Sequence, residues 1–281
     1  MEKHEAPIIQ ITGFKTFHLV IIVVLIVQAF FLGSLWTKVE VLKSGNTAAV
    51  PQQTTGQVAG AQQQAVQQQP VAPAVTLDQV KDTFSKSLIK FGDSNNKLVF
   101  IEVADPSCPY CHIAGGLNGE LNKQVGDRFT LVSDGGSYVA PVPEMKKLLD
   151  GGKAAFAWIY SPGHGNGEMG TKAMYCAFER GKFWEVHDAL MTSEGYDLLN
   201  NTVKNDKAKS EELSQFLVAS FDPAEMKTCL DSGKYDARLS EDVGLARGIG
   251  VSGTPGFFVN ETNFAGAYSF KDMESAVNAA L

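Results

Sequence analysis

Cysteine is scarce in this sequence, which has 281 residues and only four cysteines, Cys108, Cys111, Cys176 and Cys229. So few cysteines exclude the disulfide-dense scaffold that holds small secreted domains together. An even number allows one reactive pair and one structural pair, but it equally allows four free thiols in a reducing cytosol. The count alone therefore leaves the compartment open.

Basic residues are in deficit as well. The chain has 24 lysines and arginines against 31 aspartates and glutamates, for a formal net charge of −7. A general nucleic-acid binder needs a basic face for phosphate contacts, so this function class is excluded. Hydrophobic residues make up 44% of the chain, which is ordinary for a globular protein and excludes disorder of the whole chain.

Formal charge is absent from Phe17–Trp36, a run of 20 mostly apolar residues. About 20 such residues span a bilayer core of roughly 30 Å. The alternative is a cleaved signal peptide, whose apolar region is shorter, about 7–15 residues, and ends in an Ala-x-Ala-like site. No such site follows here, so we expect a single transmembrane anchor at 17–36 behind an N-terminal cytoplasmic tail, 1–16.

Lysines flank this span evenly, with Lys3 and Lys15 before it and Lys38 and Lys43 after it. The positive-inside rule therefore does not choose an orientation. We expect the C-terminal part to lie outside the cytoplasm, in the periplasm or the extracellular space, because of the chemistry described below.

Residues 37–75 have little to build a core from. Between Pro51 and Val75 there is neither a charged nor an aromatic residue, and Gln, Ala, Pro, Val and Gly dominate. Such a segment cannot offset the entropy lost on ordering, so we expect a disordered linker. A flexible coil of about 30 residues has an end-to-end distance of roughly 30 Å. That reach would let a tethered domain sweep the space near a membrane, although a spacer of untuned length fits equally well.

The remaining residues, 76–281, alternate apolar runs with amphipathic segments, as expected of an α/β domain. Short apolar runs predict strands at 98–103 and 155–160, with later strands within 250–260 and 264–268. Helices are predicted at 76–90, from Pro109 onward, within 169–191, at 210–221 and 223–233, and at 270–281. No internal repeat is evident.

The pattern Cys108-Pro109-Tyr110-Cys111 follows the first strand and opens a predicted helix. A thiolate is the attacking species in disulfide exchange, and a helix N-terminus stabilises its negative charge. The second sulfur, one turn later, can close an intramolecular disulfide or release a mixed disulfide. This spacing therefore indicates a redox-active dithiol, with Pro109 and Tyr110 tuning the first sulfur.

A zinc half-site is the main alternative for two cysteines at this spacing. It needs two further ligands, usually a second close pair. Cys176 and Cys229 lie 53 residues apart and form no such pair. We expect His112 to be a helix surface residue rather than a ligand. The prediction is a site without metal or cofactor.

Two further features accompany the dithiol. Glu102 lies inside the apolar run 98–103, where burial would raise its pKa and let it exchange a proton with Cys111. A solvent-facing glutamate is the alternative. Thr254-Pro255 directly precedes a strand and is a candidate cis peptide bond, which would leave the backbone of Thr254 free to pair with an extended substrate. An ordinary trans proline is the alternative there.

Together these motifs resemble the DsbA family of thioredoxin-fold oxidoreductases. The resemblance covers about 97–281 and rests on three patterns in order. They are the Cys-Pro-Tyr-Cys site after the strand that carries Glu102, the stretch from Lys172 to Asp188 (KAMYCA to GKFWEVHD), and Gly-x-x-Gly-Thr-Pro-x-x-Phe-Val-Asn near the end. Any one of them alone would be unspecific.

The resemblance implies an α/β thioredoxin fold with an inserted helical domain, at about 165–245. It implies that Cys108 attacks, Cys111 resolves, Glu102 is a buried acid and Pro255 is cis, with Thr254 before it in the substrate groove. It also implies that the oxidised form donates its disulfide to folding cysteine-containing proteins. A membrane partner of the DsbB or VKOR type would then reoxidise the protein.

Three departures from the family pattern bear on function. The residues between the cysteines are Pro-Tyr, as in glutaredoxins, where the best-known DsbA oxidases carry Pro-His, so disulfide reduction or isomerisation stays open. The segment 129–153 is longer than the family usually has, and we expect an extra hairpin or loop there. Gly115 and Gly116 should weaken the active-site helix.

Cys176 and Cys229 both fall in helix-like sequence in the predicted insertion. A disulfide across two packed helices would stabilise the insertion by about 2–4 kcal/mol. Two unpaired buried thiols, which behave as small apolar residues, are the alternative. The disulfide requires an oxidising compartment.

Overall fold

The computed structural model describes residues 75–281. The expected tail 1–16, the anchor 17–36 and the linker 37–75 lie outside the described residues, except for Val75. Within the part of the chain that the structure describes, no helix combines the length and the hydropathy needed to span a bilayer.

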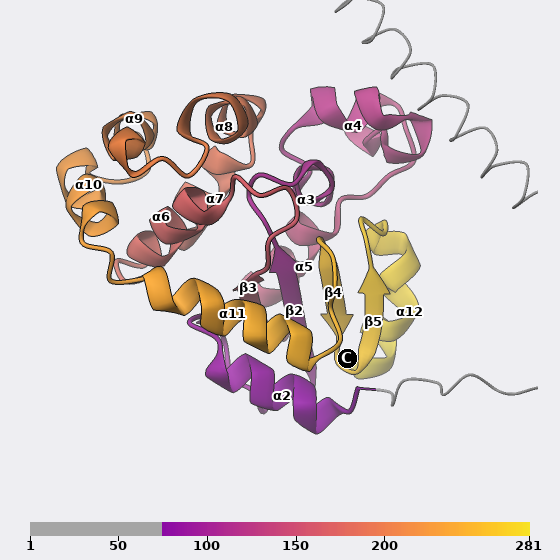
Figure 1. Cartoon of the computed structure of the whole chain (residues 1–281). Coiled ribbons are helices and arrows are strands. Elements are labelled where there is room, and N and C mark those ends of the chain that lie inside the picture. The colour runs from indigo at the N-terminus through magenta and orange to yellow at the C-terminus, as the bar shows by residue number, and fades with distance from the viewer. Residues whose placement is uncertain (1–74) are drawn as a thin grey trace, which may run out of the picture. The chain divides into compact units, whose positions relative to one another are not determined.

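A five-stranded mixed sheet lies at the centre of the domain, in the order β1-β3-β2-β4-β5 (Figure 1). β2 and β3 are parallel, and every other neighbouring pair is antiparallel. The strands are β1 Ile89–Phe91, β2 Leu98–Ala104, β3 Ala154–Tyr160, β4 Gly256–Val259 and β5 Thr262–Ala265.

Helices surround this sheet and fill most of the remaining sequence. Those before β3 are α2 Leu77–Lys86, α3 Pro109–Gly115, α4 Gly119–Val125 and α5 Pro141–Asp150. Those after β3 are α6 Glu168–Phe178, α7 Phe183–Leu190, α8 Ser193–Asp197, α9 Ser210–Phe216, α10 Pro223–Asp231, α11 Asp236–Gly248 and α12 Phe270–Ala280. The helices α6 to α11 thus form one long helical stretch between β3 and β4.

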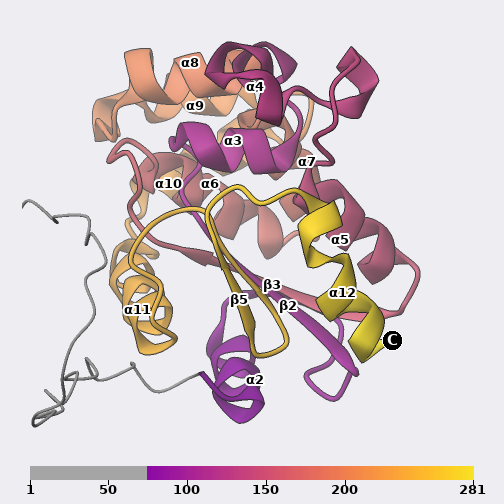
Figure 2. The ribbon, with the colours of Figure 1, turned by 90° about the vertical axis from the view of Figure 1, so that its right-hand side faces the viewer.

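Both faces of the sheet are buried, so β2 and β3 are buried along their whole length, and Glu102 is the one charged residue in either strand. Successive side chains on a strand point to opposite faces. On one face Val99, Ile101 and Val103 pack with α2 and α11. On the other face Leu98, Phe100 and Ala104 pack with α3, α5, α6, α7 and α12. Figure 2 shows α2 and α11 on one side of the sheet and α5 and α12 on the other.

The first helix begins where the sequence predicts it and ends earlier. The side chain of Thr76 caps α2 and forms a reciprocal capping box with Gln79. The predicted helix 76–90 is wrong beyond Lys86, because β1 follows and pairs with β3, placing Ile89 opposite Trp158. A three-residue strand has too little pattern of its own to be recognised without its partner.

Two other segments differ from expectation. The segment 129–153 begins as a loop, one of the two expected forms, but its second half is helix α5, which starts at Pro141, a favoured first-turn residue. In the loop before α5, one isolated β-bridge pairs Leu131 with Tyr138. Helix α11 was not predicted, because it buries only Leu239, Asp242 and Ala246 and shows a weak apolar stripe.

Candidate active site

The predicted reactive pair, Cys108 and Cys111, lies at the start of α3, after the loop that leaves the C-terminal end of β2. Cys108 is the N-cap of α3 and Pro109 occupies its first turn. The proline supplies the backbone angle that a helix start needs and lacks only an N–H that would have had no partner there. Cys111 lies one turn behind and is fully buried, whereas Cys108 keeps 4% exposure. Both cysteines are free thiols in this structure.

The two thiols differ sharply in acidity. A hydrogen bond from the Cys111 thiol, supported by the Thr254 side chain and the backbone N–H groups of Tyr110 and Cys111, lowers the pKa of Cys108 to about 6. Burial, together with its interaction with Cys108, raises the pKa of Cys111 well above its ordinary value. At neutral pH the pair is therefore a thiolate at Cys108 backed by a thiol at Cys111.

Glu102 is the buried acid beneath this pair. It is fully buried, which excludes the solvent-facing alternative, and neither carboxyl oxygen has a hydrogen-bond partner. Burial raises the pKa of Glu102 to about 7, and the charge of His187 partly opposes this rise. A carboxyl group with this pKa can both give and take a proton near neutral pH.

A second loop faces the cysteines. The peptide bond Thr254–Pro255 is cis, and the carbonyl oxygen of Thr254 lies 3.5 Å from the Cys108 Sγ. A third loop, which contains Gly163, also lies against Cys108 and Thr254. A Cβ on Gly163 would come within 1.8 Å of the Thr254 Oγ1 and 3.2 Å of the Cys108 Cβ. Only glycine fits at position 163, so this loop forms a wall of the site.

Asp105 is a residue of the site that the sequence reasoning missed. Its buried carboxylate accepts hydrogen bonds from the backbone N–H groups of Ser107 (2.7 Å), Gly163 (2.7 Å) and His164 (2.9 Å), and from the Ser107 hydroxyl (2.7 Å). It thereby ties the third loop to the loop that carries Cys108. The signal available in the sequence was an Asp directly after a buried strand and three residues before the first cysteine.

His112 is buried rather than exposed, which corrects the expectation of a helix surface residue. Its ring nitrogens lie 3.0 Å from the Met191 carbonyl oxygen and 2.8 Å from the Pro106 carbonyl oxygen. Burial lowers the pKa of His112 to about 4. His112 thus links α3 to the end of α7 and to the active-site loop, in a place where local sequence gave no sign of burial.

Tyr110 and the two glycines complete the active-site helix. The Tyr110 side chain is 45% exposed and packs edge-on against Phe129, so the segment before α5 borders the site. Gly116 ends α3 in the left-handed conformation, with φ 69°, and a Cβ there would lie 2.5 Å from the Ala140 Cβ. Gly116 is therefore the required stop of a short helix, and Gly115 is its last residue.

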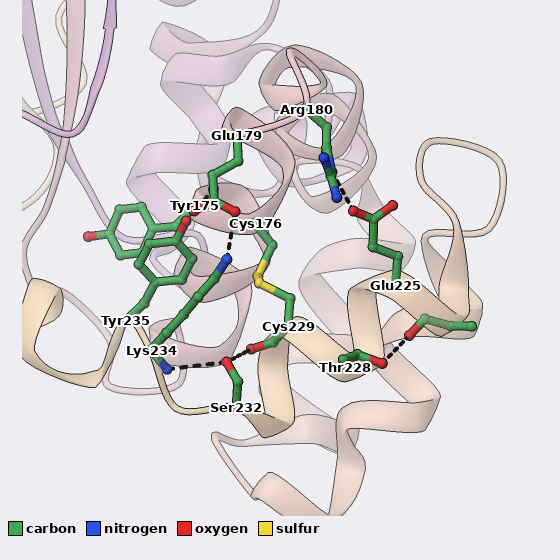
Figure 3. The surroundings of a disulfide bond; sticks show 11 residues. Tyr175, Cys176, Glu179, Arg180, Glu225, Thr228, Cys229, Ser232, Lys234 and Tyr235 are labelled. Carbon is green, nitrogen blue, oxygen red and sulfur yellow. Dashed lines mark hydrogen bonds and ion pairs between the residues drawn. A yellow bond between two sulfur atoms is a disulfide. The ribbon is translucent and has the colours of Figure 1, made fainter.

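The other two cysteines are far from this arrangement in the chain and are bonded to each other. Cys176 on α6 and Cys229 on α10 form a disulfide with a Cα–Cα distance of 6.2 Å (Figure 3). They supply no ligands to the Cys108–Cys111 pair, so the four cysteines do not assemble a zinc site. The disulfide joins two helices of the stretch between β3 and β4.

Comparisons with known proteins agree with this fold. A family model described as thioredoxin matches residues 144–279, just under half of the chain. Among solved structures, a variant of α-DsbA1 from Wolbachia pipientis aligns with a TM-score of 0.52 at 15% identity, over 73% of this chain and 96% of that protein.

Two curated relatives also match part of the chain. They are the Na⁺/H⁺ antiporters NhaA 3 of Salinispora tropica and NhaA 1 of Salinispora arenicola, 25% and 26% identical over 68% of this chain. The chain spans only 24% of the length of either antiporter. A match confined to a quarter of a transporter carries no transport activity over to this protein.

Four observations agree on the fold. They are the strand order, the dithiol at the start of α3, the facing Thr254–Pro255 loop and the structural similarity. This chain therefore has the thioredoxin fold, with a long helical stretch between β3 and β4.

Proposed function

We propose that this protein is a thiol–disulfide oxidoreductase that uses Cys108 as its nucleophile and Cys111 as its resolving thiol. One observation carries the proposal: two thiols three residues apart have pKa values shifted in opposite directions by one helix start. A structural pair gains nothing from this difference. An exchange enzyme needs it, because the nucleophilic thiol must attack or leave as a thiolate while the resolving thiol holds a proton.

Glu102 is the proton-exchanging group of this mechanism. When a substrate thiolate attacks Cys108 in the disulfide form, the bond between the two sulfurs breaks and Cys111 receives the electron pair. The protonated Glu102 supplies the proton that turns Cys111 into a thiol. In the reverse direction Glu102 takes that proton, and Cys111 then attacks the mixed disulfide on Cys108.

The direction that we propose is disulfide donation to folding secreted or membrane proteins. A pKa of about 6 at Cys108 stabilises the reduced form as a thiolate at neutral pH. Stabilising the reduced form makes the disulfide a stronger oxidant. The Thr254 backbone beside Cys108 would pair with the extended substrate segment.

The proposed place of action is the outer face of a cell membrane, with Phe17–Trp36 as the anchor and 37–75 as the tether. The Cys176–Cys229 disulfide supports an oxidising compartment, because such bonds are rare in the cytosol. A quinone-linked membrane protein of the DsbB or VKOR type would restore the Cys108–Cys111 disulfide. Protease treatment of intact cells tests the location: an extracytoplasmic domain is digested, and a cytoplasmic one is protected.

Equilibration with glutathione buffers tests the direction. A reduction potential of about −120 mV is that of a strong oxidant and supports disulfide donation. A reduction potential of about −270 mV is that of thioredoxin and would make the protein a reductase. The Pro-Tyr pair between the cysteines favours this second candidate, reduction or isomerisation by the same site.

A tethered chaperone-like binding module is the third candidate, and the variant Cys108→Ser separates it from both enzymes. Suppression of aggregation of an unfolded protein would survive this change in a chaperone. Oxidation of a reduced unfolded protein would disappear in an oxidoreductase. Persistence of thiol oxidation in Cys108→Ser would contradict the proposed function.

A further inference from the structure

The third loop of the site, residues 161–167 (SPGHGNG), joins β3 to α6. Its residues 162–165 are exposed. Gly163 nevertheless lies so close to Cys108 and Thr254 that a Cβ there would collide with the Thr254 side chain. The third loop is therefore an exposed border beside the sulfur atom that would carry a mixed disulfide.

The buried carboxylate of Asp105 holds the inner side of this loop. Its Oδ2 accepts hydrogen bonds from three consecutive backbone N–H groups, those of 163–165, at 2.7, 2.9 and 3.4 Å. Its Oδ1 accepts hydrogen bonds from the N–H and the hydroxyl of Ser107, both at 2.7 Å. Both oxygens of one carboxylate are therefore needed to join the third loop to the residue before Cys108.

The same hydrogen bonds determine the direction of the carbonyl groups in the loop. In a planar trans peptide the N–H and the C=O point in opposite directions, and within 75–281 only Thr254–Pro255 is cis. Because the N–H groups of 163–165 point inward to Asp105, the carbonyl oxygens of 162–164 point away from it. None of these three oxygens accepts a hydrogen bond from another described residue. The loop therefore presents a row of three backbone acceptors.

The outer end of the loop is held as well. The side chain of Asn205 donates a hydrogen bond to the Gly165 carbonyl oxygen at 2.8 Å and accepts one from the Met169 N–H at 3.1 Å. The backbone N–H of Asn166 donates to the Ser107 hydroxyl at 3.1 Å. The three acceptors are thus fixed before a substrate arrives, which lowers the entropic cost of binding.

An extended polypeptide is the ligand that suits such a row. Every residue of a polypeptide except proline carries a backbone N–H donor, and an unfolded chain has these donors free. On the dithiol itself, the Thr254 carbonyl oxygen lies 3.5 Å from the Cys108 Sγ. A substrate chain whose cysteine lies on Cys108 would therefore have backbone acceptors on two sides.

We propose that the carbonyl groups of 162–164 bind backbone N–H groups of the substrate polypeptide, and that Asp105 is the positioning residue that holds them in place. This inference rests on the proposed function and deepens it, because it assigns the substrate a second contact surface besides Thr254. Asp105 acts through the loop and takes no part in the exchange of electrons.

The test compares two substrates of the oxidised full chain, dithiothreitol and a short unstructured peptide that contains two cysteines. In both reactions the substrate dithiol loses two electrons and two protons and becomes a disulfide. The Cys108–Cys111 disulfide receives them and becomes two thiols. Dithiothreitol has no backbone N–H group. The readout is the ratio of the two second-order rate constants, peptide over dithiothreitol, because a change in the acidity of Cys108 affects both rates.

Two variants loosen the loop in different ways. Asp105→Asn keeps the size of the side chain, but an amide has only one oxygen and cannot accept from both Ser107 and the third loop. Asn205→Gly removes the contact with the outer end, and glycine suits the positive φ of 62° at that position. Asp242→Asn is the matched control, because this second buried carboxylate also accepts a backbone N–H, that of Tyr160 at 3.0 Å, and forms no hydrogen bond with 161–167.

We expect Asp105→Asn to lower the ratio about two- to tenfold for each hydrogen bond lost to the peptide. Asn205→Gly should lower it less, and Asp242→Asn should leave it unchanged even if the protein is less stable. An unchanged ratio in both loop variants, or an equal fall in Asp242→Asn, would overturn the inference. If Asp105→Asn does not fold, Asn205→Gly decides. A wild-type protein that oxidises neither substrate would instead refute the proposed function.

A peptide that is N-methylated beside its cysteines tests the acceptors directly, because it lacks backbone N–H groups there. The methylated peptide should react more slowly than the plain peptide with the wild-type protein. The loss should be smaller with Asp105→Asn, in which the acceptors are already displaced. The Thr254 carbonyl is present in both proteins, so its contribution cancels in this comparison. An equal loss in the two proteins would show that the carbonyl groups of 162–164 do not bind the substrate.

Discussion

The two cysteine pairs of this protein have the same chemistry and opposite surroundings. Cys108 and Cys111 share one turn at the start of α3, above a buried acid and beside the Thr254 carbonyl. Cys176 and Cys229 come from α6 and α10, 53 residues apart, and exposed charged side chains border them. Figure 3 shows these neighbours, with Glu179 paired to Lys234 and Arg180 paired to Glu225.

The difference teaches what makes a disulfide reactive. The helix start and the neighbouring thiol stabilise a thiolate at Cys108, so the open form of this pair is low in free energy. Opening the Cys176–Cys229 bond would release two thiols that no helix N-terminus favours, because both sit inside their helices. We therefore expect the first pair to cycle and the second to stay closed.

The largest expected effect comes from breaking the reactive pair. Cys108→Ser should abolish oxidation of a reduced unfolded protein, because a serine hydroxyl neither forms a disulfide nor ionises near neutral pH. Cys111→Ser should instead accumulate a mixed disulfide between Cys108 and substrate, which non-reducing electrophoresis detects. Equal behaviour of the two variants would mean that the thiols do not divide the roles of attack and resolution.

Removing the closed pair should affect stability rather than catalysis. The double change Cys176→Ala and Cys229→Ala should lower the free energy of unfolding by about 4 kcal/mol, the loop-closure value for a separation of this length. Urea unfolding measures this loss. The reduction potential of the Cys108–Cys111 pair should stay unchanged, and a shifted potential would show that the two pairs are coupled.

Replacing the buried acid should raise stability in a pH-dependent way. The pKa of Glu102 in the folded protein, about 7, lies above the ordinary 4.5. The contribution of the Glu102 carboxyl to the free energy of unfolding is therefore fully present below pH 4.5 and is lost as pH rises toward 7. Above pH 7 this loss amounts to about 3 kcal/mol, at about 1.4 kcal/mol per pKa unit.

Glu102→Gln should therefore match the reduced wild-type protein near pH 4 and exceed its stability by up to about 3 kcal/mol at pH 8. Denaturant unfolding of both proteins at several pH values gives this difference directly. A constant difference between pH 4 and pH 8 would mean that Glu102 does not titrate in the folded protein over this range.

The smallest expected effect is at the surface around the closed pair. Lys234→Ala removes the exposed ion pair with Glu179, and such pairs contribute about 0–1 kcal/mol. The free energy of unfolding should change by no more than that, and the change should shrink in high salt. A larger loss would indicate that the charges around Cys176–Cys229 hold the helices together along with the disulfide.

Local patterns account for the elements that could be predicted. The apolar runs at 98–103 and 155–160 became β2 and β3, and Pro109 and Pro223 mark the helix starts that such prolines favour. The short strand β1 and the helix α11 were missed, because one exists through its pairing with β3 and the other buries only three residues. The sequence predicts only a loop or hairpin over 129–153, where the structure has helix α5 with Pro141 at its start.

The sequence by itself determined the closely spaced cysteine pair and its position at a helix start, because cysteines three residues apart behind a strand need no distant partner to be recognised. Only the tertiary structure decided the surroundings. The burial of His112 and the ties of Asp105 to 163–165 each join segments from different parts of the chain. Burial and charge depend on these contacts, and so the acidity of the dithiol could not be derived before the chain was folded.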